Sequence, residues 1–197
     1  MTELNVFMVV FAAVFTDNIL LSNYLGMCSF LGVSREVRTS LGLGTAVIFV
    51  LTFTSALNHI LYHQLLAPLG LEYLRFIAFI LVIAAFVQLV EMAIERISER
   101  LYAALGIFLP LITVNCAILG VSLFMVIRDY AFWTSVAFGF GSGVGWALAI
   151  LAMAGIRQTR LPRARIPRGL EGAGIALIIA GMMALAFMGF NGMVSLN

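Results

Sequence analysis

Long stretches without a charged side chain dominate this sequence. Four of them, over 39–71, 101–127, 130–156 and 172–197, contain no Asp, Glu, Lys or Arg. Each exceeds the roughly 20 apolar residues that an α-helix needs to cross a hydrocarbon core. With 63% hydrophobic and 10% charged residues, the composition is that of a membrane protein. It excludes a soluble enzyme, a secreted toxin and a nucleic-acid-binding protein.

Two further apolar segments contain isolated charges. Asp17 is the only charge in the first of them. Arg75 and Glu91 lie near the two ends of the other. We therefore predict an all-α integral membrane protein with six transmembrane helices. Their predicted ranges are 4–34, 39–62, 71–94, 101–127, 132–155 and 170–192.

The basic residues, all of them Arg, are distributed unevenly among the predicted loops. Arg75 and Arg128 lie on one side of the membrane, and the other nine lie in loops one, three and five. Those nine are Arg35, Arg38, Arg96, Arg100, Arg157, Arg160, Arg163, Arg165 and Arg168. The positive-inside rule places loops one, three and five in the cytoplasm and both termini on the opposite face.

The two halves of the chain share a motif that contains its only two cysteines. Residues 28–34, CSFLGVS, recur at 116–122 as CAILGVS. Each half has three predicted spans, and because three is odd, the second half crosses the membrane in the opposite direction. We predict an inverted-topology 3+3 repeat, with one copy at 1–98 and the other at 99–197, in one membrane domain.

Spans one and four are predicted to be broken helices. A continuous helix over 5–34 would be about 45 Å long, which is too long for a core of about 30 Å without strong tilt. Residues that interrupt a helix occur in both spans: Asp17, Asn18, Ser22, Asn23 and Gly26 in the first, and Pro110, Thr113 and Asn115 in the fourth. Cys28 and Cys116 are therefore expected near two equivalent breaks.

Three roles are open to this pair of cysteines. They could be small buried hydrophobic residues, they could form a disulfide, or they could bind a metal. Retention of the same thiol beside the same LGVS sequence in both halves argues against the first role. Thiolates prefer zinc, copper(I) or iron–sulfur clusters, and a [2Fe-2S] cluster needs four ligands. This chain would supply two of them, so a partner would supply the rest.

The segments around both cysteines carry a family resemblance. Residues 25–34, LGMCSFLGVS, and 106–117, GIFLPLITVNCA, resemble a family of bacterial membrane subunits. This family comprises the D-type and E-type subunits of the sodium-translocating NADH:quinone reductase, Nqr, and the A-type and E-type subunits of the Rnf ferredoxin:NAD oxidoreductase. The resemblance covers essentially the whole chain. Residues 128–130, 139–146 and 153–157 are more similar to the E type of Nqr than to the A type of Rnf.

The resemblance implies an electron-transfer function. The D-type and E-type subunits are paralogues of opposite topology that hold one [2Fe-2S] cluster, and the ligand positions in this chain would be Cys28 and Cys116. The cluster would relay electrons in NADH-to-ubiquinone transfer coupled to Na⁺ export, with NADH and flavins bound by other subunits. The expected setting is the bacterial inner membrane, with periplasmic termini. Expected partners are the D-type paralogue, the remaining Nqr subunits and lipid, with no nucleic acid.

Two acidic residues inside predicted spans are candidates for an ion path. An ionisable group within a span is costly, and Asp17 and Glu91 are such groups. As alternatives, Asp17 would cap the broken half-helix, and Glu91 would pair with Arg96 or Arg100.

Two other patterns have ordinary structural explanations. Gly139, Gly141, Gly143 and Gly145 resemble a phosphate-binding loop, but no strand or Lys accompanies them, so close helix packing is favoured. His59 and His63 have a spacing that could bind haem or a metal, but anchoring at the membrane interface is favoured.

Two alternative functions remain at this point. One is that of the paralogous A-type subunit of an Rnf complex, and the other, from a different class, is a small stand-alone inverted-repeat ion transporter. The duplicated cysteines favour an electron-transfer role over a transporter. No P-loop or dinucleotide-binding fingerprint is present in the sequence, so the chain is not expected to bind NADH or to be active alone.

Overall fold

The computed structural model describes residues 6–97, 109–161, 167, 169–170 and 172–190. This part of the chain is helical and contains no β-strand, as predicted. The helices are α1 (Val6–Phe11), the π-helix η1 (Ala12–Thr16), α2 (Met27–Val33), α3 (Val37–Leu61), the π-helix η2 (Tyr62–Leu66), α4 (Ala67–Leu69), the 3-10 helix η3 (Glu72–Leu74), α5 (Arg75–Ile97), α7 (Leu109–Thr113), α8 (Cys116–Ile127), α9 (Phe132–Thr159) and α10 (Ala173–Met188).

Three helical segments in the described part of the chain are long and apolar enough to cross a membrane. They are Val37–Leu69, Glu72–Ala93 and Phe132–Thr159. Three shorter apolar segments, Val6–Thr16, Leu111–Ile127 and Ala173–Met188, fall within the other predicted spans. The chain is therefore an integral membrane protein of several apolar helices, whereas the number of six complete crossings stays a prediction.

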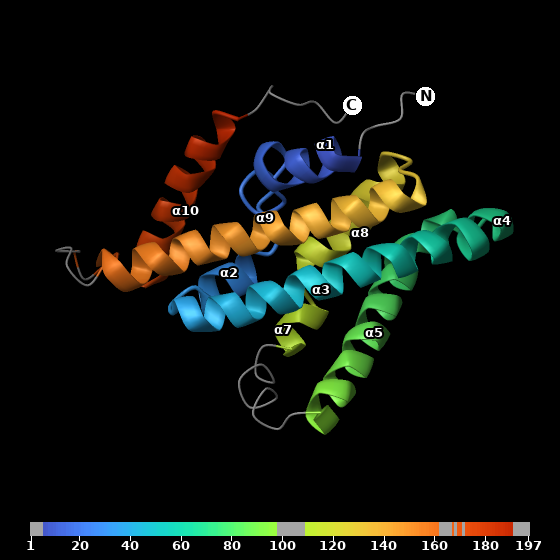
Figure 1. The fold of residues 1–197 in the computed structure, drawn as a ribbon, viewed down its shortest axis with the longest axis horizontal. Helices are drawn as coiled ribbons and strands as arrows, with labels where there is room; N and C mark the ends of the chain where they lie inside the picture. Colours follow the sequence, from blue (N-terminus) through green and yellow to red (C-terminus); the bar gives the residue numbers. More distant parts are fainter. Residues whose placement is uncertain (1–5, 98–108, 162–166, 168, 171, 191–197) are drawn as a thin grey trace.

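The centre of the fold is the pair α3 and α9, which lie side by side and antiparallel (Figure 1). Glycines on α9 make this contact close. Gly139 and Gly143 face α3, and a Cβ atom on Gly143 would lie 2.9 Å from the Ile48 Cα atom. Gly141 and Gly145, on another face of α9, lie against the backbone of α1 and η1. The prediction that these glycines serve close helix packing is thus confirmed.

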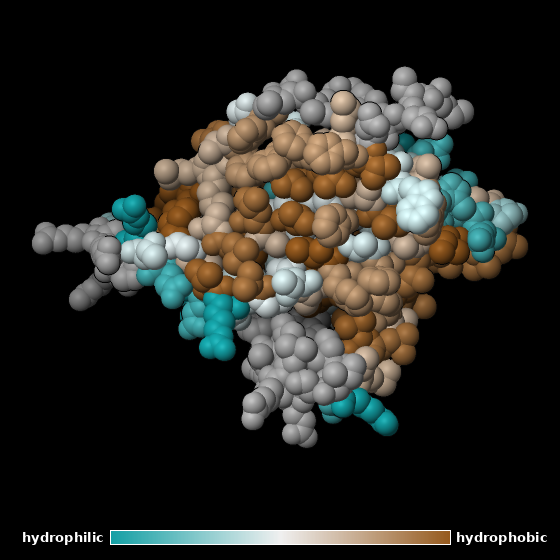
Figure 2. Space-filling view, viewed as in Figure 1, coloured by the Kyte–Doolittle hydropathy of each residue, from teal (hydrophilic) through white to brown (hydrophobic). Residues whose placement is uncertain are grey.

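Apolar side chains cover much of the surface of the molecule. Figure 2 shows brown, hydrophobic residues across the middle of the visible face, with teal residues toward its edges. Burial within the chain differs among the long helices: it is 67% for α9 but only 17% for α5, in the most apolar window of each. Most of α5 is therefore left to contact lipid or other proteins.

The first and fifth loops begin at the same end of the molecule. The Arg157 side chain donates hydrogen bonds from Nη1 to Ser34 Oγ at 2.9 Å and to the Leu31 carbonyl oxygen at 3.1 Å. The start of α3 and the end of α9 accordingly meet at the left of Figure 1. This proximity agrees with the Arg distribution, while most of loop three, at 98–108, lies outside the described residues.

Reporter fusions would test the orientation in the membrane. A reporter at Asn197 should be periplasmic and one within 158–168 cytoplasmic, because the Arg-rich loops are retained on the cytoplasmic side. The measurement is the activity of a reporter that works on only one side of the membrane. Equal activity at both positions would contradict the six-span topology.

Candidate functional site

The first apolar segment is interrupted between η1 and α2, and Asn18 organises this break. Its buried side chain accepts hydrogen bonds at Oδ1 from the amides of Leu20 and Leu21, at 3.1 and 3.3 Å. Its Nδ2 atom donates to the Val14 carbonyl oxygen at 3.0 Å and to that of Gly145, on α9, at 2.9 Å. One side chain thus satisfies backbone groups on both sides of the break and ties the break to the second half of the chain.

The fourth apolar segment is interrupted between α7 and α8, next to Cys116. Asn115 is the N-cap of α8, and its Oδ1 atom accepts a hydrogen bond from the Ala117 amide at 3.0 Å. Its Nδ2 atom donates to Ser29 Oγ on α2 at 3.2 Å. Both breaks therefore occur in the segments where the sequence predicted them, and a hydrogen bond connects them.

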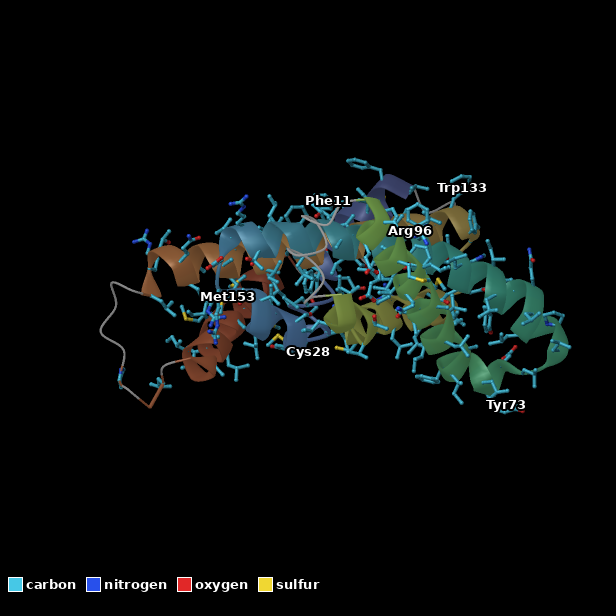
Figure 3. The ribbon with its side chains drawn as sticks, turned by 90° about the horizontal axis from the view of Figure 1, so that it is seen from below. Phe11, Cys28, Tyr73, Arg96, Trp133 and Met153 are labelled. Carbon is cyan, nitrogen blue, oxygen red and sulfur yellow. The ribbon has the colours of Figure 1, made fainter. Side chains whose placement is uncertain are left out.

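The two breaks meet at the cysteines. The Gly26 amide donates a hydrogen bond to Cys116 Sγ at 2.9 Å, and Gly26 is only two residues before Cys28. Cys28 lies in the first turn of α2, and Cys116 is the first residue of α8. Figure 3 shows Cys28 at the edge of the molecule. The repeated motif thus brings its two thiols to one region of the fold.

Both cysteines are free and exposed in the isolated chain. Interpreting them as small buried hydrophobic residues is therefore wrong, and no disulfide joins them. The described residues contain no group of three or more His, Cys, Asp or Glu side chains that could hold a metal ion. Two thiolates can supply only some of the ligands that a metal centre needs, so the remaining ligands would have to come from another chain.

A tight backbone cradle lies beside Cys116. Gly26 has a left-handed conformation with φ of 86°, and a Cβ atom there would lie 2.5 Å from Trp146 Nε1 and 3.2 Å from Ala117 Cβ. Trp146, on α9, is fully buried, and its Nε1 atom has no hydrogen-bond partner in the described structure. The sequence did not indicate that Trp146 is a neighbour of Gly26, because its only distinguishing feature there is an indole at the end of the glycine run.

Asp17 is held by an ion pair outside the apolar helices. Its carboxylate lies 2.6 Å from Nη2 of Arg128, in the loop between α8 and α9, and accepts a further hydrogen bond from Asn23 at 3.3 Å. Burial alone would lower the pKa of Arg128, but hydrogen bonds with Asp17 and Tyr130 raise it. The carboxylate therefore does not cap the broken helix, because Asn18 fills the role expected of Asp17.

Glu91 lies on α5 and is partly exposed. The expected ion pair with Arg96 is not among those formed by the described residues, and Arg100 lies outside them. Among the described residues, no hydrogen bond or ion pair joins Glu91 to Asp17 or to the cysteines. Its role in an ion path stays a prediction.

The two histidines form a local aromatic cluster near the end of α3. The rings of His59 and His63 have centroids 4.3 Å apart, and His59 Nε2 lies 3.0 Å from the Tyr130 carbonyl oxygen. This contact connects α3 to the loop between α8 and α9. A structural role explains the spacing of these histidines without a bound metal.

Comparison with known proteins identifies similar membrane proteins. A protein-family model described as "Rnf-Nqr subunit, membrane protein" matches residues 6–194. A protein of Idiomarina loihiensis, named as the E-type subunit of a Na(+)-translocating NADH-quinone reductase, is 54% identical over 91% of this chain and 94% of its own length. A protein of Acetobacterium woodii, named as the A-type subunit of a Na(+)-translocating ferredoxin:NAD(+) oxidoreductase complex, is 50% identical over 94% and 96%.

Proposed function

Because this chain belongs to the Rnf-Nqr family of membrane-protein subunits, we propose that it supplies two of the four ligands of an intramembrane [2Fe-2S] cluster. The relatives' names support the coarser statement that it is a membrane component of a Na⁺-translocating redox complex. The proposed ligands are Cys28 and Cys116. The observation that carries the proposal is the hydrogen bond from Gly26 to Cys116, which joins the breaks of the two apolar segments.

The residues at this site fit half of such a cluster. Two free thiols, which become good ligands for iron when deprotonated, are exposed at one region of the surface. A Cβ atom at Gly26 would meet Trp146, Ala117 and Asn115, so a residue without a side chain is needed to bring this amide to Cys116. The buried, unpartnered N–H of Trp146 lies next to the same glycine. When bound, the cluster would supply a relay for one electron.

The helices of this chain would hold the ligands in place. Asn115 caps α8 and fixes Cys116 at its first residue, and Ser29 accepts from Asn115 while donating to the Gly26 carbonyl oxygen at 3.1 Å. Arg157 binds the C-terminal end of α2 from the end of α9. Both ends of the short helix that contains Cys28 are thereby attached to the second half of the chain.

A paralogous partner of opposite topology, the D-type protein in an Nqr complex, would complete the site. Exposure of both thiols in the isolated chain is what a shared site requires, since a partner's cysteines must reach the same iron atoms. The weakly buried helix α5 also leaves a large apolar surface for lipid or other proteins of the complex. NADH and flavins would be bound by other members of the complex.

The choice between the two complexes rests on small differences. Identity is 54% to the Nqr relative and 50% to the Rnf relative, so we propose Nqr, with NADH and ubiquinone as the redox pair, ahead of Rnf. A stand-alone transporter fits less well. The named relatives are subunits of redox complexes, and a transporter has no use for two exposed thiols at matching motif positions.

Metal analysis of the assembled complex tests this function. The chain co-expressed with its paralogous partner should purify with two iron atoms and two acid-labile sulfides per pair, as the formula of the cluster requires. The chain purified alone should contain neither in stable form. An intact, anaerobically purified pair without iron would contradict the proposal.

Neutral substitutions test the proposed ion path. Asp17→Asn and Glu91→Gln should weaken the Na⁺ dependence of quinone reduction while leaving bound iron unchanged. Loss of the partly exposed ion pair between Asp17 and Arg128 should lower the free energy of unfolding by less than about 1 kcal/mol, so the complex should still assemble. The matched control is Asp129→Asn, because Asp129 is exposed and forms no ion pair with described residues. Wild-type Na⁺ activation in both variants would leave these acids with structural roles only.

A further inference from the structure

We infer that the Gly26 amide is a positioning donor that holds the Cys116 sulfur, and that Trp146 closes the space beside Gly26 to any side chain. Together they would set the reduction potential of the centre bound at this site. The inference rests on the proposed function, because it concerns the sulfur as a ligand. Neither residue is a ligand itself, and both act through Cys116.

The hydrogen bond itself is the first observation. The Gly26 nitrogen lies 2.9 Å from Cys116 Sγ, although 90 residues separate them in sequence. The contact therefore depends on the packing of one half of the chain against the other. Hydrogen bonds to cysteine sulfurs are among the features that set the potentials of iron–sulfur centres. Because such a bond stabilises negative charge on sulfur, it favours the reduced form.

Only glycine can present its amide in this way. A φ of 86° is unfavourable for residues with a Cβ atom. The space is also closed, since that atom would meet Trp146 Nε1 at 2.5 Å and both Ala117 Cβ and Asn115 Oδ1 at 3.2 Å. A larger residue must move the backbone, and with it the donor, away from the sulfur.

Trp146 limits the space beside Gly26, and its side chain has little freedom to move. Its side chain is fully buried, and α9 is held near it by the hydrogen bond from Asn18 to the Gly145 carbonyl oxygen. The ring therefore cannot swing away easily when a side chain is added at Gly26. Its Nε1 atom is a buried donor without an acceptor in the described structure. Buried polar atoms without a partner are uncommon in proteins, so this one calls for an explanation.

The test measures the potential of the centre in the assembled complex. Gly26→Ala should lower the equilibrium constant for its reduction by about tenfold, which for one electron is about 59 mV. The readout is an EPR-monitored redox titration. The matched control is Gly32→Ala. Gly32 lies on α2, the helix whose N-cap is Gly26, and an added Cβ there would have no atom within 4 Å, so this variant should leave the potential unchanged.

A second variant tests the role of Trp146. Trp146→Phe removes the atom nearest the added methyl group, so in the Gly26→Ala background it should return the potential toward the wild-type value. A wild-type potential in Gly26→Ala with full iron content would overturn the inference. An equal shift in Gly32→Ala would also overturn it.

A measurement on unmodified protein covers the case in which Gly26→Ala fails to assemble. With ¹⁵N-labelled glycine, pulsed EPR of the reduced complex should show a weak coupling to a glycine amide nitrogen. Absence of that coupling would overturn the inference. Failure of the proposed function would look different, because the wild-type complex would then show no cluster signal that depends on Cys28 and Cys116.

Discussion

Cys28→Ser and Cys116→Ser should each abolish the [2Fe-2S] signal of the assembled complex, to the same extent. Serine is nearly the same size as cysteine but is a poor ligand for this soft site. Loss of one ligand should therefore remove bound iron while the helices remain packed. Electron transfer should stop downstream of the NADH-oxidising flavoprotein, and NADH oxidation by artificial acceptors should continue.

The measurements are iron content, the optical spectrum and the EPR signal of the reduced complex. A suitable control is Val114→Ala, which changes an exposed side chain two positions before Cys116 without touching a thiol. This control should keep its iron. Full iron in either serine variant, or loss in only one of them, would contradict equivalent ligand roles.

Gly143→Ala should destabilise the protein strongly for so small a change. The added Cβ would lie 2.9 Å from the Ile48 Cα atom, which belongs to backbone and can give way only if α3 and α9 separate. Overpacking of this kind costs about 1–3 kcal/mol. The measurement is the thermal unfolding midpoint in detergent, together with the fraction of chain found in the complex.

The matched control lies on the same helix. A Cβ on Gly155 would meet no atom within 4 Å, so Gly155→Ala should be neutral or slightly stabilising because alanine favours helix. Opposite signs for the two alanines would support the packing of α3 against α9. Equal midpoints would show that this contact is looser than the structure indicates.

Local patterns were sufficient to predict the helices and their breaks. Uncharged apolar runs gave the helical segments, and a run too long for one crossing indicated the break that Asn18 and Gly26 form. The glycine run on α9 was correctly interpreted as packing. The spacing could not show which elements these glycines pack against, because that depends on tertiary contacts. Gly143 packs against α3, and Gly141 packs against α1 and η1.

The details of the site depend on contacts between distant residues. Asp17 and Asn18 are neighbours with similar capping ability, so sequence alone could not show that Asn18 binds the break while Asp17 pairs with Arg128. The contact of Gly26 with Cys116 joins the two halves and has no local signal. The duplicated motif drew attention to both cysteines, and their role as ligands stays a prediction.

An anaerobic structure of the assembled complex is the most direct test of shared ligation. Iron-specific density should lie next to the sulfurs of Cys28 and Cys116, with both bound to one diiron centre and two more thiolates supplied by the paralogous partner. Sulfurs bound to separate centres, or too far apart to reach a common one, would contradict the account.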